Sequence, residues 1–177
     1  MRTSAEGPRA LLFMRHCKSD WDQDGVDDFD RPLSGRGIED ARRMGRFLKE
    51  SGLAPDALVA SPSARTRRTV EIVARRAKCR LPIVWERSLY GTGADTYVST
   101  LRALEGSITT PLLVGHNPSL EEIIALLTGG YVRLPTGAMV LLHPGTELYP
   151  LRRWSELAPG SCALAWLVTP RLARALL

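Results

Sequence analysis

The sequence predicts an α/β fold, a three-layer α/β/α sandwich with a mostly parallel central sheet. Short apolar runs typical of buried strands alternate along the chain with segments whose apolar residues recur at helical spacing. The 177 residues are enough for one sizeable core, and 44% hydrophobic with 24% charged residues is an ordinary globular balance. We therefore expect a single domain over residues 10–177, preceded by a flexible leader at residues 1–9.

The first half of the chain predicts two strands, each followed by a helix. Apolar runs place the strands at residues 10–14 and 57–60. Ser34 is suited to cap a helix that runs to Glu50 and is closed by Ser51 and Gly52. A second helix is expected after the next strand, with Pro62 in its first turn.

The second half continues this alternation and then changes. Strands are expected at residues 82–85 and 111–114, followed by helices at 94–104 and from Pro118 onward. Residues 138–142 and 162–168 then predict two strands without an obvious helix between them. We expect this last pair to form an antiparallel edge of the sheet.

Composition and charge narrow the classes of function. Lys and Arg (24) exceed Asp and Glu (19), giving a net charge of +5, but the basic residues are scattered and aromatic residues make up only 6%. This disfavours a nucleic-acid site. The three cysteines form no CxxC pair and no metal-binding pattern with the three histidines, so we expect no metal and a reducing, cytoplasmic location. No stretch approaches the roughly 20 apolar residues of a membrane span.

Polar side chains follow three of the expected strands at the point where each strand ends. The polar segments are RHCKS at 15–19, SPSARTRRT at 61–69 and VGHNP at 114–118. The carboxyl ends of neighbouring parallel strands meet at one edge of a sheet, where ligands bind. Arginine guanidinium groups match phosphate oxygens, and a neutral imidazole can attack phosphorus. The three segments therefore predict a site for covalent phosphoryl transfer to histidine.

The motifs RHCKSDW, SPSARTRRT and GHNP, in this order, resemble those of the histidine phosphatase superfamily, and in particular of its small phosphohistidine phosphatase (SixA-like) branch. The resemblance covers nearly the whole chain and implies a phosphoglycerate mutase-like fold. It implies that His16 is the nucleophile, that Arg15 and Arg65 bind the phosphate, and that His116 contacts the phosphoryl group. Asn117 accompanies His116 in the motif. No cofactor is implied.

Four residues of these motifs have more than one possible role. Lys18 and Ser19 are close enough to His16 in sequence to bind the phosphate, although Ser19 could equally bond the local turn. Asn117 also suits a helix cap. Cys17 stands where the superfamily commonly has glycine, and we expect a small buried filler rather than a redox-sensitive thiol. A Cys-x5-Arg phosphatase is excluded because position 23 is Gln23.

The general acid is the least defined role. Larger members of the superfamily place a carboxylate after the third strand, where this chain has Glu86. The alternative is that Glu86 is a surface carboxylate paired with Arg87. A phosphohistidine substrate needs less acid assistance, because imidazole is a better leaving group than an alkoxide.

These observations lead to one functional expectation and two alternatives. We expect a metal-independent phosphohydrolase that acts through a phosphoenzyme at His16 on phosphohistidine proteins or small phosphomonoesters, with no nucleic-acid or membrane partner. One alternative is a phosphate- or phosphoprotein-binding module with little turnover. The other, a phosphomutase, is disfavoured because the segment from Arg65 to His116 is too short for a lid insertion.

Overall fold

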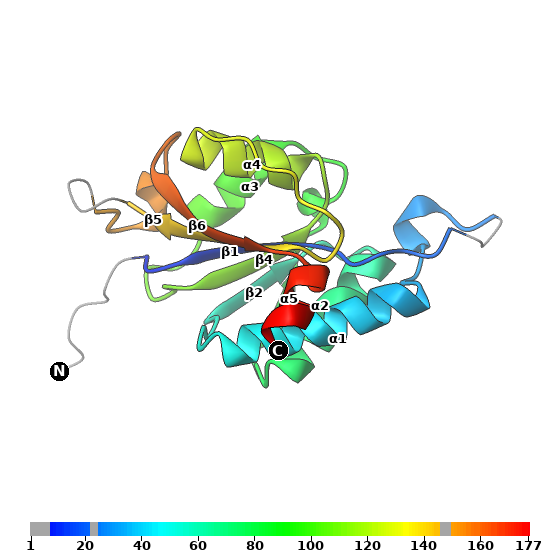
Figure 1. The fold of residues 1–177 in the computed structure, drawn as a ribbon. Coiled ribbons are helices and arrows are strands. Elements are labelled where there is room, and N and C mark those ends of the chain that lie inside the picture. The colour runs from blue at the N-terminus through cyan, green and yellow to red at the C-terminus, as the bar shows by residue number, and fades with distance from the viewer. Residues whose placement is uncertain (1–7, 22–24, 146–149) are drawn as a thin grey trace.

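The computed structural model describes residues 8–21, 25–145 and 150–177. Its centre is a six-stranded sheet in the order β3-β2-β4-β1-β5-β6 (Figure 1). The strands are β1 (Leu11–Arg15), β2 (Ala57–Ala60), β3 (Ile83–Trp85), β4 (Pro111–Gly115), β5 (Met139–Pro144) and β6 (Cys162–Val168). The first four are parallel, whereas β5 is antiparallel to both β1 and β6. The predicted sandwich and its antiparallel edge are confirmed.

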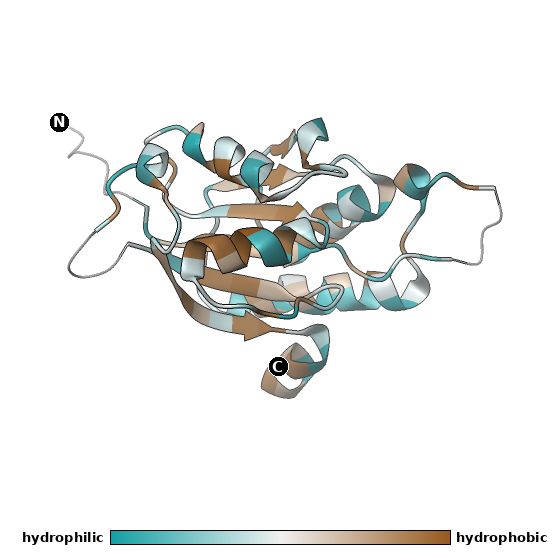
Figure 2. Ribbon diagram, turned by 90° about the horizontal axis from the view of Figure 1, so that it is seen from above, coloured by the Kyte–Doolittle hydropathy of each residue, from teal (hydrophilic) through white to brown (hydrophobic). Residues whose placement is uncertain are grey.

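Helices cover both faces of this sheet. Below it in Figure 1 lie α1 (Gly35–Glu50), α2 (Ala64–Arg76) and α5 (Pro170–Leu176), and above it lie α3 (Ala94–Arg102) and α4 (Ser119–Thr128). Side chains of β1 alternate between the two layers: Leu12 and Met14 pack with α1 and α2, and Phe13 packs with α3 and α4. Figure 2 shows the resulting hydrophobic residues along the strands. Burial of each such side chain contributes about 1.5–3 kcal/mol.

Helix α1 begins as predicted and holds the loop after β1. The Ser34 hydroxyl accepts a hydrogen bond from the Gly37 N–H at 3.1 Å and donates one to the Lys18 carbonyl, also at 3.1 Å. A Cβ atom at Gly37 would lie 2.1 Å from the Lys18 carbonyl oxygen. Gly37 therefore allows the helix to approach the loop that carries the predicted nucleophile.

Some expected helix boundaries differ from the structure. Pro62 lies before α2 rather than in its first turn, because the helix begins at Ala64 with Ser63 as its N-cap. Asn117 does not cap α4, whose N-cap position is Pro118. The sequence reasoning overlooked α5, which begins at Pro170 and is capped by the Thr169 hydroxyl.

Two further expectations concern the ends and the environment of the chain. Residues 1–7 of the expected leader lie outside the described residues, so the leader stays a prediction. Among the helices in the described part of the chain, none is both long enough and apolar enough to cross a bilayer.

Candidate active site

A pocket of 440 Å³ lies at the carboxyl ends of β1, β4 and β2. Strand β4 lies between the other two, with Gly115 beside Arg15 and Val114 beside Ala60. The residues that follow the three strands are therefore neighbours. The predicted site residues that line the pocket are Arg15, His16, Lys18, Ser19, Arg65, His116 and Asn117.

His16 follows β1 directly and is only 7% exposed. Its Nδ1 lies 2.8 Å from the Cys17 carbonyl oxygen, which can only accept a hydrogen bond. The neutral ring therefore carries its proton on Nδ1 and keeps an unprotonated Nε2. This Nε2 accepts a hydrogen bond from Arg65 Nε at 3.3 Å. A guanidinium, a group that can bind phosphate, thus lies beside an unprotonated imidazole nitrogen, which can attack phosphorus.

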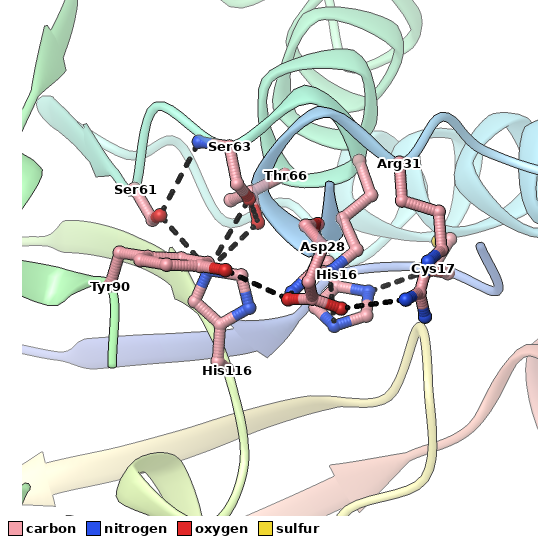
Figure 3. Close-up of polar contacts among 10 residues, drawn as sticks. His16, Cys17, Asp28, Arg31, Ser61, Ser63, Thr66, Tyr90 and His116 are labelled. Carbon is pink, nitrogen blue, oxygen red and sulfur yellow. Dashed lines mark hydrogen bonds and ion pairs between the residues drawn. The ribbon is translucent and has the colours of Figure 1, made fainter. Parts of the chain in front are cut away.

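His116 follows β4 and lies against His16, with ring centroids 5.1 Å apart. Its Nε2 is 2.9 Å from the Ser61 hydroxyl and 3.4 Å from the hydroxyls of Ser63 and Thr66 (Figure 3). When a hydroxyl donates to Nε2, the ring proton lies on Nδ1, the nitrogen that Figure 3 shows on the side of His16. His116 can then donate a hydrogen bond to a phosphoryl oxygen.

Burial keeps both histidines neutral. The pKa of His16 is lowered to about 3, chiefly because burial removes its solvation. The bond to the Cys17 carbonyl opposes this shift, and the neighbouring His116, Arg65 and Arg15 add to it. The pKa of His116 falls to about 4, again chiefly through burial, with Arg65 contributing. At neutral pH, His16 therefore has the free electron pair that a nucleophile needs.

The Arg15 side chain is held in place by the segment that follows α4. Its Nη1 donates to the Leu134 carbonyl at 2.9 Å, and Asn117 Nδ2 donates to the same carbonyl at 3.1 Å. Asn117 Nδ2 also donates to Glu121 Oε1 at 2.7 Å. Arg15 Nε and Asn117 Oδ1 are buried and have no hydrogen-bond partner among the described residues. A buried donor without a partner is costly, and an anion in the pocket would satisfy Arg15 Nε.

Asp28 places a carboxylate in the same pocket. Its Oδ2 accepts hydrogen bonds from Arg65 Nη2 and from the Tyr90 hydroxyl, each at 2.8 Å, and Oδ1 lies 3.2 Å from Arg31 Nη2. The Tyr90 ring stands edge-on to His116, with centroids 5.3 Å apart. Although partial burial opposes it, the bonds from Tyr90 and Arg65 and the charge of Arg31 lower the pKa of Asp28. Asp28 is therefore ionised at neutral pH.

Glu86 does not line this pocket. Its Oε1 accepts hydrogen bonds from the Ser88 N–H at 3.1 Å and the Ser88 hydroxyl at 2.7 Å, which lowers its pKa. The physical reason is topological: Glu86 follows β3, an edge strand that β2 and β4 separate from β1. The structure thus does not bring this expected general acid to His16.

The remaining motif residues shape the loop after β1. Lys18 is exposed, whereas Ser19 is buried and its backbone forms an isolated bridge with Leu33. Cys17 is fully buried, its N–H donates to Thr69 Oγ1 at 3.0 Å, and burial raises the pKa of its thiol to about 12. Cys17 therefore fills the core, as the sequence suggested.

Sequence reasoning missed two residues that lie behind His116 and two that line the pocket. Ser61 and Thr66 stand inside the quoted motif SPSARTRRT and support His116. Asp28 and Tyr90 were also overlooked. The long connection between β1 and α1 was the available signal for Asp28, because long loops without regular structure are often functional.

Comparison with known proteins identifies the family. The family model of the histidine phosphatase superfamily (branch 1) matches residues 11–90. The uncharacterized protein Rv1276c of Mycobacterium tuberculosis (strain H37Rv) is 30% identical over 169 residues, which cover 89% of this chain and 100% of that protein.

Solved structures share the fold along most of the chain. A provisionally assigned phosphohistidine phosphatase SixA from Nakamurella multipartitia has a TM-score of 0.78 at 25% identity and covers 94% of this chain and 98% of that one. The protein histidine phosphatase SixA in complex with tungstate has a TM-score of 0.75 at 22% identity, with coverages of 92% and 97%.

A phosphoglycerate mutase from Bacillus anthracis has a TM-score of 0.67 at 12% identity, with 98% of each chain covered. This likeness confirms the phosphoglycerate mutase-like fold. The chain belongs to the histidine phosphatase superfamily, and within it the chain is SixA-like.

Proposed function

We propose that this protein is a metal-independent phosphohistidine phosphatase in which His16 Nε2 is the nucleophile. The main support is the 2.8 Å contact between His16 Nδ1 and the Cys17 carbonyl, because it leaves Nε2 unprotonated. The similarity to SixA structures supports a phosphorylated protein as the substrate.

In the first step, the electron pair of His16 Nε2 forms a bond to phosphorus while the bond from phosphorus to the substrate's phosphohistidine ring breaks. The second nitrogen of that ring has taken a proton from solvent before the bond breaks, so the ring takes the bonding electron pair and leaves as neutral imidazole. Arg15, Arg65 and His116 donate hydrogen bonds to the phosphoryl oxygens, whose negative charge they stabilise throughout the transfer. Arg65 Nε turns from His16 Nε2 to a phosphoryl oxygen when the substrate binds.

In the second step, water attacks the phosphorus atom, the bond to Nε2 breaks, and inorganic phosphate leaves. Asp28 is the one carboxylate among the described residues that line the pocket. Because it is ionised, it can accept the proton of this water but cannot protonate a leaving group. An ionised Asp28 thus favours phosphohistidine over alkyl phosphates, whose alkoxide needs a proton.

The decisive experiment is to trap the phosphoenzyme. The protein is mixed briefly with a peptide carrying radiolabelled phosphohistidine and is then denatured. We expect an acid-labile, base-stable label on His16, and the same label in His143→Ala, which changes an exposed histidine of β5 outside the pocket. Binding of the peptide without a label in either protein would contradict the proposal and indicate a binding module.

A second experiment tests the two carboxylates. We expect Asp28→Asn to slow hydrolysis of the phosphoenzyme by about 10²-fold, because a positioned base contributes about 10²–10⁴-fold. Glu86→Gln should leave turnover of phosphohistidine, p-nitrophenyl phosphate and an alkyl phosphate unchanged. If Glu86→Gln slowed the alkyl phosphate selectively, Glu86 would be the proton donor after all.

A further inference from the structure

Two hollows on the α1 face continue the catalytic pocket. Thr136 borders both the pocket and a hollow of 510 Å³, and this hollow shares Glu39, Arg43 and Arg174 with a third one of 570 Å³. The two hollows follow α1 from Arg36 to its last turn, roughly 20 Å at 1.5 Å per residue. Figure 1 shows α5 beside α1 on this face. We call the two hollows together the basic groove.

The basic groove has an excess of positive charge that the protein does not neutralise. Its carboxylates already have partners: Asp40 pairs with Arg43 at 2.9 Å, Glu50 pairs with Lys49 at 3.6 Å, and Glu39 pairs with Arg42. Five exposed cations of the groove have no carboxylate within ion-pair distance among the described residues. They are Arg46, Arg76, Lys78, Arg171 and Arg174.

The lining also indicates which kind of anion fits. None of the described residues that line the groove is aromatic, so bases of a nucleic acid would find no ring on which to stack. Leu177, Pro135 and Pro170 are its large apolar residues, which is too few for an amphipathic helix. An acidic peptide needs neither feature. In extended form, about six residues span the length of the groove.

We propose that the basic groove binds an acidic segment of the phosphorylated protein substrate, next to the residue whose phosphoryl group enters the catalytic pocket. This proposal rests on the proposed phosphatase function. It requires that the substrate is a protein whose polypeptide runs out of the catalytic pocket, past Thr136, and into the groove. The groove would then select among phosphoproteins by charge, while the pocket recognises the phosphoryl group itself.

The test compares two double variants of equal net charge. Arg46→Glu with Arg174→Glu reverses two groove cations, and Arg152→Glu with Arg153→Glu reverses two exposed cations that line neither hollow nor the pocket. The probes are a phosphohistidine peptide flanked by six glutamates, a matched peptide with six glutamines, and p-nitrophenyl phosphate. Two acidic peptides are used: one has the six glutamates before the phosphohistidine, and the other has them after it.

We expect the groove variant to lose about tenfold in kcat/KM for an acidic peptide, since exposed charge pairs contribute modestly and reversal adds repulsion. It should retain full activity on the glutamine peptide and on p-nitrophenyl phosphate, which also shows that it is folded. The control variant should keep its preference for the acidic peptide. Equal losses in both variants would overturn the proposal, because they would reflect net charge alone.

Direct binding separates the groove from the reaction. Fluorescence anisotropy of the unphosphorylated acidic peptide should show salt-dependent binding that the groove variant weakens and the control variant retains. If the enzyme is active but binds neither acidic peptide, the groove proposal is wrong and the proposed function stands. If an acidic peptide binds but no phosphoenzyme forms, the proposed function is wrong. Tighter binding of a single-stranded oligonucleotide than of the peptide would also overturn the groove proposal.

Discussion

His16 and His116 occupy equivalent places in the fold but have different hydrogen-bond partners. Each follows a buried parallel strand, each is almost fully buried, and burial lowers the pKa of each. A backbone carbonyl fixes the proton of His16 on Nδ1, whereas hydroxyl groups surround Nε2 of His116. A carbonyl can only accept, but a hydroxyl can accept or donate. The hydrogen-bond partner of one ring nitrogen therefore determines which nitrogen carries the proton, and so whether the nitrogen that faces the pocket can attack or donate.

The largest expected effect comes from removing the proposed nucleophile. His16→Gln should reduce turnover of p-nitrophenyl phosphate to the buffer background, because the variant lacks the imidazole that we propose as the attacking group. Arg15 and Arg65 remain, so inorganic phosphate should still bind, which isothermal titration calorimetry can measure. Near-native turnover in this variant would contradict the proposal that His16 attacks phosphorus while His116 only donates a hydrogen bond.

A smaller loss is expected at the second histidine. His116→Gln should slow turnover by about 10²–10³-fold, the usual effect of removing one donor that stabilises developing charge. The radiolabelled phosphoenzyme should still form on His16, only more slowly, in a rapid-quench experiment. Complete absence of the label would mean that His116 is as essential to the first step as His16.

The dependence on pH tests whether both rings are neutral. With pKa values of about 3 and 4, kcat/KM corrected for substrate ionisation should stay level down to about pH 5 and decline below pH 4. A histidine with the ordinary pKa of 6.5 would already have lost about thirtyfold at pH 5. The measurement uses p-nitrophenyl phosphate, which survives in acid, and a decline that begins near pH 6.5 would contradict the neutral assignment.

The same shifts affect stability. Between the folded and unfolded pKa values of each histidine, the unfolded chain binds more protons than the folded one. The free energy of unfolding should therefore decrease as the pH falls from about 6.5 toward 3. The melting temperature of His16→Gln should decrease less over this range than that of the unchanged protein.

No effect is expected from a chelator. No group of three or more His, Cys, Asp or Glu residues in the described part of the chain is arranged to hold a metal ion. Both histidines have roles as free imidazoles in the proposed reaction. Incubation with EDTA should leave kcat/KM unchanged, and a loss restored by a divalent cation would show that the histidines act through a metal.

The sequence predicted those parts of the site that depend on the position of a residue relative to its own strand. His16 and His116 follow β1 and β4 directly, and Arg65 lies in the first turn of α2, the helix that follows β2. Periodicity identifies these strands, and parallel strands bring their carboxyl ends together. The order of the strands depends on packing, and it decides that Glu86 follows an edge strand. Asp28 was missed because its contact with Arg65 joins residues 37 positions apart, across a loop without periodic pattern. The prediction that Asn117 caps α4 was wrong, because its side-chain amide instead donates hydrogen bonds to Glu121 and to the Leu134 carbonyl.

The buried thiol of Cys17 affects how this site responds to oxidants. Phosphatases that use a cysteine nucleophile need a thiolate, and the same thiolate is the form that peroxide oxidises. Here the sulfur next to the proposed nucleophile is fully buried, and a thiol pKa of about 12 keeps it protonated. Peroxide and alkylating reagents, which inactivate cysteine phosphatases, should not react with Cys17, because its thiol is inaccessible and protonated. The proposed dephosphorylation at His16 should therefore continue under oxidising conditions that inactivate enzymes with a catalytic thiolate.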